Sequence, residues 1–534
     1  MTATVDHHLR HSEIPASRPD WVTDQVISEL CARVFRDPSG TESVTAYAPY
    51  DSMQIATIPA STAQDVRDAV AAARLGQVAW RKRDLRERAQ VLLAFHDLFL
   101  AEQDKLIDLI QWEMGKARFT AWQEILQVAN ITRHYARAGR RYLAPQGVRG
   151  AIPGLTKVAE TRVPKGVVGI ISPWNYPFYL GVGDAVPALL AGNAVVSTAD
   201  SQTALTLLFA RELMGRAGLP TDLWQIVVGP GNVVGTALID EVDYICFTGS
   251  TATGRTVGEQ AGRRLIGASL ELGGKNPLIV RKDADLTKAA EGAVASSFAN
   301  TGQMCIHTER VLVHTDVYDA FRTAIVDATR SLRLGQTFDY TVDIGSLASP
   351  AQLATVADHV EGARAAGATV LTGGRSRPDL GPLMYEPTIL EGVTEEMVVC
   401  HEETFGPVIS LYPFSTDAEA IALANEGSYG LSASIWTKDT HTARTMAAQI
   451  RSGSVNINDG AAAAAGSIEA PMGGMGDSGL GRRHGAEGIR KYTEAQTVAE
   501  QRGMALGPPA SMTLDKFVNL TNGQLKLLRK LRVR

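Results

Sequence analysis

The sequence Tyr244-Ile-Cys-Phe-Thr-Gly-Ser-Thr-Ala-Thr-Gly254 joins a short apolar run to a segment of glycine and hydroxyl residues. Residues 244–247 are typical of a buried β-strand, and the residues after them open a predicted helix. The free N–H groups and the dipole of a helix start favour a pyrophosphate, so Gly249 and Ser250 are candidate dinucleotide contacts. The segment lacks the usual G-x-G-x-x-G spacing, and a plain strand-to-helix turn stays an open alternative.

Apolar runs on both sides of this stretch alternate with helical patterns. Before it we expect strands at 167–171, 194–196 and 226–228 and helices at 179–190, 203–217 and 233–239. After it we expect strands at 277–280, 311–313 and 369–371 and helices at 318–331 and 352–366. Such alternation predicts two α/β lobes with parallel sheets covered on both faces.

Other parts of the chain have different patterns. Residues 62–143 have apolar residues at helical spacing and predict several helices. Residues 146–165 are rich in glycine, proline and β-branched residues, which indicates extended chain or a hairpin that forms an arm. Residues 460–466 and 472–481 are expected to be loops.

Composition and charge exclude several classes of protein. The 534 residues carry a net charge of −5, which offers no footprint for nucleic acid. Four cysteines lie far apart without the spacing of a zinc or redox site, so we expect no metal site and reduced thiols in a cytoplasm. The first twenty residues do not resemble a secretory signal. The most apolar stretch, 186–196, is too short to cross a membrane, which takes roughly 20 residues.

Three segments carry groups suited to carbonyl chemistry: P-W-N-Y-P at 173–177, E-L-G-G-K at 271–275 and G-Q-M-C at 302–305. Together they supply an amide, a carboxylate and a thiol. A thiolate can attack a carbonyl carbon, an amide N–H can stabilise the oxyanion, and a carboxylate can activate water. Singly none is specific, because a lone cysteine is more often a buried apolar residue, as we expect for Cys246 and Cys400.

With F-T-G-S at 247–250, E-E-T-F-G-P-V at 402–408 and P-M-G-G-M-G-D-S-G-L-G-R at 471–482, these segments resemble the aldehyde dehydrogenase superfamily. The resemblance runs from about Ala46 to Gln496 and is nearest to the NAD(P)-dependent members like succinate-semialdehyde dehydrogenase. It implies an α/β fold with a Rossmann-like dinucleotide-binding lobe, a second α/β catalytic lobe and a β oligomerisation arm. The expected parts are an N-terminal extension (1–45), the dinucleotide-binding domain (46–145 and 166–272), the catalytic domain (273–485), the arm (146–165 and 486–500) and a C-terminal extension (501–534).

The resemblance also implies roles for individual residues. Cys305 would be the nucleophile, Glu271 the base that releases the acid, and Asn175 with the backbone N–H of Cys305 the oxyanion hole. An aldehyde would be oxidised to the carboxylic acid through a cysteine thiohemiacetal and thioester, with hydride passing to the nicotinamide. The expected cofactor contacts are Trp174, Thr198, Ser201, Gly249, Ser250, Leu272, Glu403 and Phe405.

Two other functions stay open. Members that pass the acyl group to coenzyme A look as though they lack a carboxylate at the position of Glu271, which favours hydrolysis here. A retired member that binds cofactor or a partner without turnover is the second alternative. By resemblance we expect a homodimer or homotetramer that acts on a small-molecule aldehyde.

The chain departs from the family at Thr198-Ala199, where members usually have Lys-Pro. That lysine contacts the adenine-side ribose, so its loss removes a charged hydrogen bond. Asp200 would disfavour a 2′-phosphate, but Ser201 stands where NAD-selective members tend to have glutamate. We expect NADP as cofactor, with NAD as the alternative.

The substrate is the second departure. By resemblance, succinate-semialdehyde dehydrogenases hold the distal carboxylate of their substrate with arginines just after the P-W-N motif and just before the G-Q-x-C motif. At those positions this chain has Gly183 or Asp184 and Ala299. An aspartate would repel such a substrate. Tyr176, Tyr179 and Ile306 are expected at the mouth, which favours an apolar or aromatic aldehyde over succinate semialdehyde.

The C-terminal extension ends in a basic segment, with five Lys or Arg residues in 525–534. It is expected to contact a membrane surface weakly, to dock onto a neighbouring subunit, or to have no fixed structure.

Overall fold

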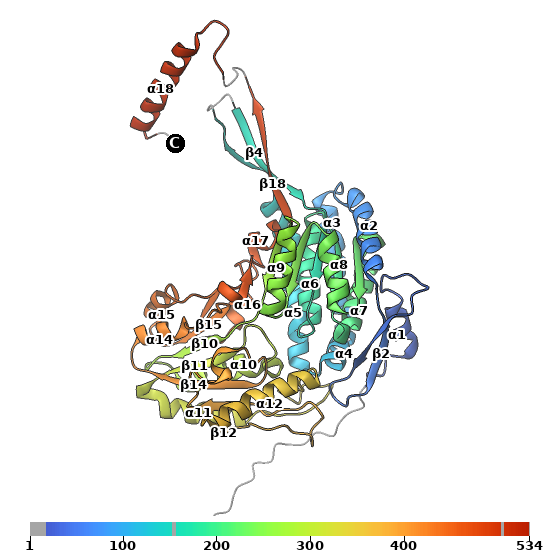
Figure 1. Cartoon of the computed structure of the whole chain (residues 1–534), viewed down its shortest axis with the longest axis vertical. Coiled ribbons are helices and arrows are strands. Elements are labelled where there is room, and N and C mark those ends of the chain that lie inside the picture. The colour runs from blue at the N-terminus through green and yellow to red at the C-terminus, as the bar shows by residue number, and fades with distance from the viewer. Residues whose placement is uncertain (1–17, 152–155, 503–506, 533–534) are drawn as a thin grey trace, which may run out of the picture.

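Two mainly parallel β-sheets organise residues 18–151, 156–502 and 507–532, the residues that this computed structural model describes (Figure 1). The first sheet has the strand order β17-β9-β8-β5-β6-β7. Its strands are β5 (Val167–Ile171), β6 (Ala194–Ala199), β7 (Trp224–Val228), β8 (Tyr244–Thr248), β9 (Gly267–Glu271) and β17 (Gly479–Leu480). β5 to β9 are parallel and β17 is antiparallel. The strands predicted from the four apolar runs up to Phe247 are therefore confirmed.

Helices cover both faces of this sheet, as expected for strands that are apolar on both sides. α2, α8 and α9 pack against one another on one face, and α3, α5, α6 and α7 lie on the other (Figure 1). Their bounds are α2 (Ala63–Trp80), α3 (Leu85–Ala101), α5 (Arg118–Leu143), α6 (Pro177–Leu190), α7 (Ala204–Arg216), α8 (Gly231–Glu241) and α9 (Thr251–Arg263). Around them lie α1 (Asp24–Cys31), α4 (Gln103–Met114), β1 (Ser43–Tyr47) and β2 (Gln54–Pro59).

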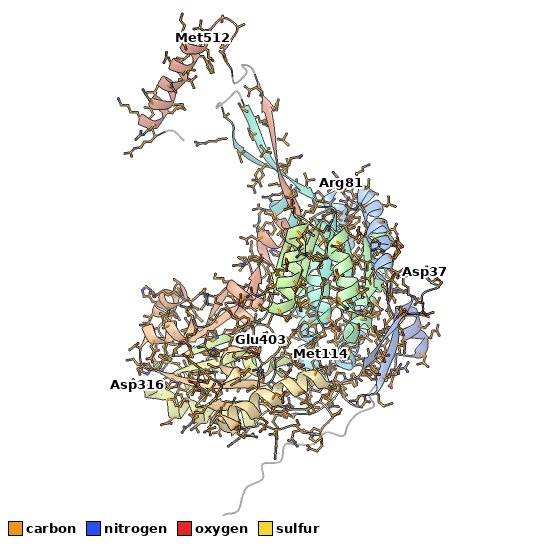
Figure 2. All side chains as sticks on the ribbon, in the orientation of Figure 1. Asp37, Arg81, Met114, Asp316, Glu403 and Met512 are labelled. Carbon is orange, nitrogen blue, oxygen red and sulfur yellow. The ribbon has the colours of Figure 1, made fainter. Side chains whose placement is uncertain are left out.

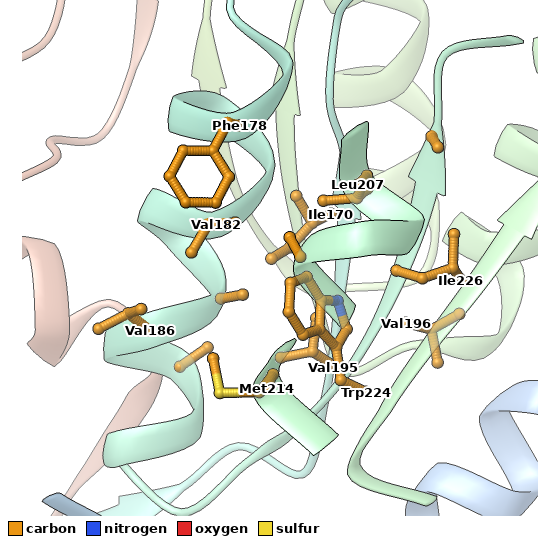
Figure 3. Packing of buried hydrophobic residues seen from close by; sticks show 14 of the residues in the cluster. Ile170, Phe178, Val182, Val186, Val195, Val196, Leu207, Met214, Trp224 and Ile226 are labelled. Atoms are coloured by element: carbon orange, nitrogen blue, oxygen red, sulfur yellow. The ribbon is translucent and has the colours of Figure 1, made fainter. Parts of the chain in front are cut away.

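The core between the sheet and α6 and α7 is apolar (Figure 3). Trp224 is fully buried there, and its indole N–H donates to Ser197 Oγ at 2.9 Å. The one polar atom of this large side chain is thus paired, as burial requires.

The second sheet has the order β12-β13-β14-β11-β10-β15-β16. Its strands are β10 (Asn276–Val280), β11 (Thr308–His314), β12 (Thr369–Thr372), β13 (Thr388–Glu391), β14 (Val408–Phe414), β15 (Ser432–Trp436) and β16 (Ser454–Ile457). Its helices are α10 (Leu286–Phe298), α11 (Tyr318–Arg330), α12 (Pro350–Ala365), α13 (Val398–His401), α14 (Asp417–Ala424) and α15 (Thr440–Ala447). The predicted second α/β lobe is confirmed. The loops expected at 460–466 and 472–481 are wrong in part, because Ala462–Ala465 forms one helical turn, α16, and Gly479–Leu480 forms the short strand β17.

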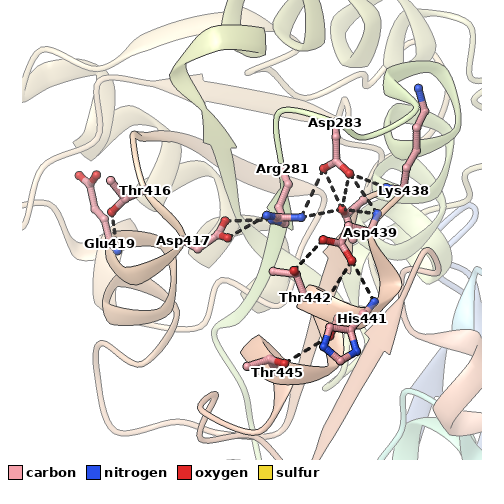
Figure 4. A network of polar contacts seen from close by, with 11 residues as sticks. Arg281, Asp283, Thr416, Asp417, Glu419, Lys438, Asp439, His441, Thr442 and Thr445 are labelled. Carbon is pink, nitrogen blue, oxygen red and sulfur yellow. Dashed lines mark hydrogen bonds and ion pairs between the residues drawn. The ribbon is translucent and has the colours of Figure 1, made fainter.

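A polar network stabilises the outer end of this lobe (Figure 4). Arg281 forms a two-point ion pair with Asp417, at 2.9 and 2.8 Å. Asp283 accepts hydrogen bonds from Thr437 and from the backbone N–H groups of Lys438 and Asp439. The network ties β10 to the turns that precede α14 and α15.

The arm is an antiparallel sheet of β3 (Gln146–Arg149), β4 (Thr156–Pro164) and β18 (Thr493–Gln501), in the order β18-β4-β3. The expected hairpin is present as β3 and β4, and β18 pairs with β4 along its whole length. α17 (Gly485–Arg490) precedes β18 and packs against α5. The arm projects from the first lobe (Figure 1), and β18 is exposed from Glu494 to Gln501.

The described part of the C-terminal extension forms a helix, α18 (Leu514–Lys530), that stands apart from both lobes (Figure 1). None of its described residues is buried. Within the described ranges, no helix combines the length and the apolar composition needed to cross a membrane.

Candidate active site

The predicted site residues meet where the carboxyl ends of the first sheet face the amino ends of the second. Trp174 and Asn175 follow β5, Ser250 follows β8, and Glu271 ends β9. Cys305 precedes β11 and Glu403 precedes β14. Figure 2 shows Glu403 at the junction of the two lobes. The fold therefore brings together segments that are far apart in the sequence.

Cys305 sits on a tight loop, and its residue is partly exposed. Gly302 has φ +72°, and a Cβ there would lie 2.0 Å from the carbonyl oxygen of Gly406. Only glycine lets these two backbones approach so closely. Asn276 Nδ2 donates to the carbonyl oxygen of Cys305 at 2.8 Å and so ties the loop to the start of β10.

Asn175 lies next to the same loop and is buried. Its Nδ2 donates to the carbonyl oxygen of Gln303 at 3.1 Å. Its own carbonyl oxygen accepts a bond from Lys116 Nζ at 2.6 Å. The amide predicted for the oxyanion hole thus contacts the backbone of Gln303, which precedes Cys305 by two residues in the same loop.

A buried ion pair orients this turn. Lys116 Nζ and Glu124 Oε1 are 2.8 Å apart, and both side chains have no exposure. The other oxygen of Glu124 accepts the backbone N–H groups of Phe178 and Tyr179 at 3.0 Å each. The carboxylate therefore binds the first turn of α6, while the lysine binds Asn175, two residues before the helix.

Glu271 is buried, and its Oε1 has no hydrogen-bond partner among the described residues. Burial raises the pKa of this carboxyl to about 7, and Arg483 and Lys491 oppose that rise. A carboxyl with a pKa near neutrality is suited to general base chemistry.

Arg483 is a cationic group that acts on Glu271 and that the sequence analysis does not identify. Its Nη2 donates to Asp184 Oδ2 at 2.7 Å and to Thr248 Oγ1 at 2.6 Å. Thr248 is the β8 partner of Glu271 in the sheet register. The guanidinium therefore lies beside the carboxylate at the same sheet edge.

The thiol of Cys305 lies among carboxylates. Burial raises its pKa to about 12, and the Glu403 and Glu271 charges add to the rise, whereas Arg483 opposes it. Without further positive charge the thiol is protonated at neutral pH. A cation that enters this site would favour the thiolate.

The loop of Glu403 is held by a second buried cluster. Glu309 accepts the backbone N–H groups of Thr404, at 2.9 Å, and Phe405, at 3.1 Å. Lys275 and His307 both contact the same carboxylate. Phe405 has φ +52° and packs edge-on against Trp174, with ring centroids 5.6 Å apart. These contacts place the two predicted aromatic cofactor residues together.

Glu403 itself accepts the backbone N–H of Gly274 at 3.0 Å. A Cβ at Gly273 would lie 2.1 Å from a carboxylate oxygen of Glu403, so the missing side chain leaves room for this group. Burial and the Glu309 charge raise the pKa of Glu403 to about 7.

The predicted dinucleotide contacts fit a cofactor. Ser250 is the N-cap of α9 and accepts the N–H of Thr253, and Gly249 links β8 to it. Leu272 packs against Gly254, where a Cβ would meet its side chain at 2.3 Å. Thr198 lies in β6, and Ser201 starts the short helix 201–203 after it. The start of α9 directly after β8, with glycine at 249 and 254 where a Cβ would clash, suits the binding of a dinucleotide.

Three residues are expected at the substrate mouth: Tyr176 contacts the thiol segment, Ile306 belongs to it, and Tyr179 contacts the segment around 472–484. Tyr176 Oη contacts Met304 Sδ at 3.5 Å, and Ile306 follows Cys305 directly. Tyr179 Oη contacts His484 Nε2 at 3.4 Å and Met472 Sδ at 3.9 Å.

The prediction that Asp184 would repel a carboxylated substrate is wrong. Asp184 is 3% exposed, and Arg483 and Lys491 form ion pairs with it at 2.7 and 3.0 Å. Tyr492 Oη donates to it at 2.7 Å. Burial alone would raise its pKa, but the two cations hold the pKa below its usual range. The charge is balanced inside the protein and is not presented to a ligand.

Neutralising either carboxylate near the thiol tests these electrostatics. We expect Glu271→Gln and Glu403→Gln to speed iodoacetamide labelling of Cys305 several-fold at pH 9, because less negative charge lowers the thiol pKa. Mass spectrometry of the Cys305 peptide measures the rate. Glu402→Gln, at the exposed neighbour of Glu403, should leave it unchanged. Equal or slower labelling in both test variants would contradict this account.

Comparison with known proteins agrees with this geometry. The family model described as the aldehyde dehydrogenase family matches residues 35–498. A Mycolicibacterium smegmatis protein named "Putative succinate-semialdehyde dehydrogenase (NADP(+))" is 50% identical over 482 residues, which cover 90% of this chain and 93% of the relative.

Solved structures are similar as well. The succinate-semialdehyde dehydrogenase from Burkholderia pseudomallei has a TM-score of 0.83 and 33% identity, covering 86% of this chain and 95% of that one. An NADP-dependent enzyme from E. coli has a TM-score of 0.84 and 34% identity, covering 89% and 99%. The chain therefore belongs to the aldehyde dehydrogenase family.

Proposed function

We propose that this enzyme oxidises an aldehyde to the carboxylic acid with Cys305 as nucleophile, Glu271 as general base and Asn175 as oxyanion donor. The observation that carries the proposal is the meeting of these three groups at one sheet junction, with a buried carboxyl whose pKa is about 7. Each group has the chemistry that its step requires.

Cys305 Sγ would form a bond to the aldehyde carbon while its proton leaves to solvent. Asn175 Nδ2 and the Cys305 backbone N–H would stabilise the resulting oxyanion. Trp174, Glu403 and Phe405 would hold a nicotinamide cofactor next to this carbon, and that group would supply a positive charge and a hydride acceptor. Glu271 would then take a proton from a water molecule as its oxygen attacks the thioester carbon, and the C–S bond breaks to release the acid.

We propose NADP as the cofactor, with NAD as the alternative. Trp174, Glu403 and Phe405 would hold the nicotinamide end, and Gly249, Ser250 and Leu272 the centre. At the adenine end, Ser201 offers a hydroxyl where a carboxylate would repel a 2′-phosphate. Asp200 caps the helix 201–203 through the N–H of Gln202, at 2.9 Å, which occupies one of its oxygens. The names of the M. smegmatis and E. coli relatives support this choice.

We propose a semialdehyde with a distal carboxylate, such as succinate semialdehyde, as the substrate class. The names of two relatives support it, and the balanced charge of Asp184 removes the objection to an anionic substrate. The aromatic groups Tyr176 and Tyr179 favour an apolar or aromatic aldehyde as a second candidate. Glu271 argues against transfer to coenzyme A, and the three intact catalytic groups argue against a retired enzyme.

An aldehyde panel tests the reaction. We expect formation of reduced cofactor with succinate semialdehyde, with kcat/KM higher for NADP than for NAD and no rate in Cys305→Ala. Short, long and aromatic aldehydes are run in parallel, with and without coenzyme A. Absorbance of the reduced cofactor is the measurement. A higher kcat/KM for benzaldehyde than for succinate semialdehyde would favour the second candidate substrate. If no aldehyde gave reduced cofactor although the protein binds the cofactor, the proposed enzymatic activity would be wrong.

Charge changes at Asp184 and Arg483 should shift the pH dependence of kcat in opposite directions. The part of the pH profile that shifts is its acid limb, where kcat falls as the pH is lowered. Arg483→Met removes a cation beside Glu271, so the pKa of Glu271 rises and the limb moves to higher pH, by roughly one unit. Asp184→Asn leaves Arg483 and Lys491 uncompensated, so the pKa falls and the limb moves to lower pH. The base must be ionised, so activity is lost as pH falls through that pKa.

Arg281→Met is the matched control for this experiment. Its side chain is 13% exposed against 10% for Arg483, and it pairs with Asp417 far from Cys305. It should lower the melting temperature without moving the limb. Shifts of both test variants in the same direction would show that they act through general damage.

We also propose that the enzyme is a cytoplasmic homodimer or homotetramer. All four cysteines are free thiols, which supports a reducing compartment. The exposed strand β18 is an open sheet edge of a kind that proteins usually cover, and α18 leaves apolar residues such as Leu525 and Leu528 exposed. A second copy covering these surfaces explains both.

Mass photometry tests this assembly. Full-length protein should be a dimer or tetramer, and deletion of residues 501–534 should weaken it. If deletion leaves the assembly intact but abolishes co-sedimentation with anionic vesicles, α18 contacts membranes instead. A full-length monomer would contradict the oligomer.

A further inference from the structure

A pocket of about 580 Å³ lies between α5 and the segment after α16. Its volume is within the range of small-molecule sites, roughly 300–1,000 Å³. Its lining residues differ from those of the candidate active site. They are Asn130, Arg133, His134, Arg137, Ala138 and Arg141 on α5, and Gly466, Ile468 and Glu469 opposite.

The α5 wall is strongly basic. Arg133, Arg137 and Arg141 are spaced four residues apart, so they project from one face of the helix. Burial lowers the pKa of His134 and so disfavours its charged form. Glu469 is the one acidic residue among the lining residues. The lining carries a net charge of two positive units.

Internal partners satisfy only part of this charge. Arg141 pairs with Glu469 at 2.5 Å, but the two side chains are 66% and 71% exposed, and such surface pairs are weak. Arg133 donates to the amide oxygen of Asn130 at 2.8 Å, which is neutral. Within the described ranges, Arg137 has no ion-pair partner. Two guanidinium groups thus face the pocket without a carboxylate.

The helix itself does not explain the three arginines. Cations near a helix C-terminus are favourable, but the effect fades within the last turn. α5 ends at Leu143, so Arg141 lies in that turn, whereas Arg137 and Arg133 lie one and two turns earlier. Like charges four residues apart repel each other. A bound anion would remove this cost.

We propose that this pocket binds a small polycarboxylate, a molecule with two or three carboxylates. Guanidinium groups one helical turn apart can each take one carboxylate through two hydrogen bonds. Ile468 and Ala138 would contact the carbon chain between them. A compact inorganic anion such as phosphate has no carbon chain for Ile468 and Ala138 to contact.

The far wall connects the pocket to the base. Gly485 N–H donates to the carbonyl oxygen of Ile468 at 2.8 Å, and Met472 and Arg483 exchange two backbone hydrogen bonds. Gly473, next to Met472, lies against Glu271, where a Cβ would be 3.1 Å from Oε1. A ligand that joins α5 to this wall holds the segment beside Glu271 in place.

The test uses the full-length chain and citrate as the probe, at constant ionic strength set with sodium chloride. We expect citrate to raise the melting temperature saturably, and calorimetry to give a matching isotherm. The Arg133→Gln/Arg137→Gln double variant should lose both effects. It should melt no lower than the unchanged chain without citrate, because the repulsion between these arginines is relieved.

Arg140→Gln is the matched control, since Arg140 is exposed on the same helix but does not line the pocket. It should respond to citrate like the unchanged chain. An equal response in the double variant, or an equal response to inorganic phosphate at the same ionic strength, would overturn the proposal. A third outcome would also overturn the proposal: the unchanged chain does not bind citrate, and the double variant has a different oligomer size. The pocket would then be a subunit interface.

Discussion

The site depends on how the protein balances three carboxylates where the two sheets meet. Glu271 and Glu309 are buried and Glu403 is half-buried, and Glu271 and Glu403 act on the thiol of Cys305. Burial opposes ionisation of each carboxyl. Lys275 and His307 hold the pKa of Glu309 low, at about 2, whereas Glu271 and Glu403 have pKa values near 7. The cluster thus combines one carboxylate whose ionised form is stabilised with two carboxyls whose pKa values lie near neutrality.

The same ion pairs fix the backbone. Glu309 binds the N–H groups of the loop that carries Glu403, and Glu124 binds those at the start of α6 after Asn175. These carboxylates replace the partners that loop and helix-start N–H groups would otherwise find in water. The reacting groups are therefore held on rigid loops, because each loop is attached to a charge that is itself paired. Such pre-organisation is what an oxyanion site requires.

The sequence predicts the first sheet and the catalytic trio well. Its strands are short apolar runs, and Asn175, Glu271 and Cys305 stand in continuous motifs. β15 was not predicted, because its serines hide a fully buried strand. Asp184 was misjudged, since its partner Arg483 lies 299 residues later in the chain. Local patterns carry strand and motif information, but a charge pair closed by the tertiary fold leaves no local signal.

Asp184 also shows why a site cannot be assigned by the charge of one residue. Its carboxylate, read alone, opposes an anionic substrate, but with Arg483 and Lys491 it belongs to a group with a net positive charge. That group lies beside Glu271 and favours its ionised form. Asp184 therefore does not exclude an anionic substrate, and it is one of the charged groups that determine the pKa of Glu271. Because Arg483 also lowers the thiol pKa, one buried cation favours the reactive forms of both nucleophile and base.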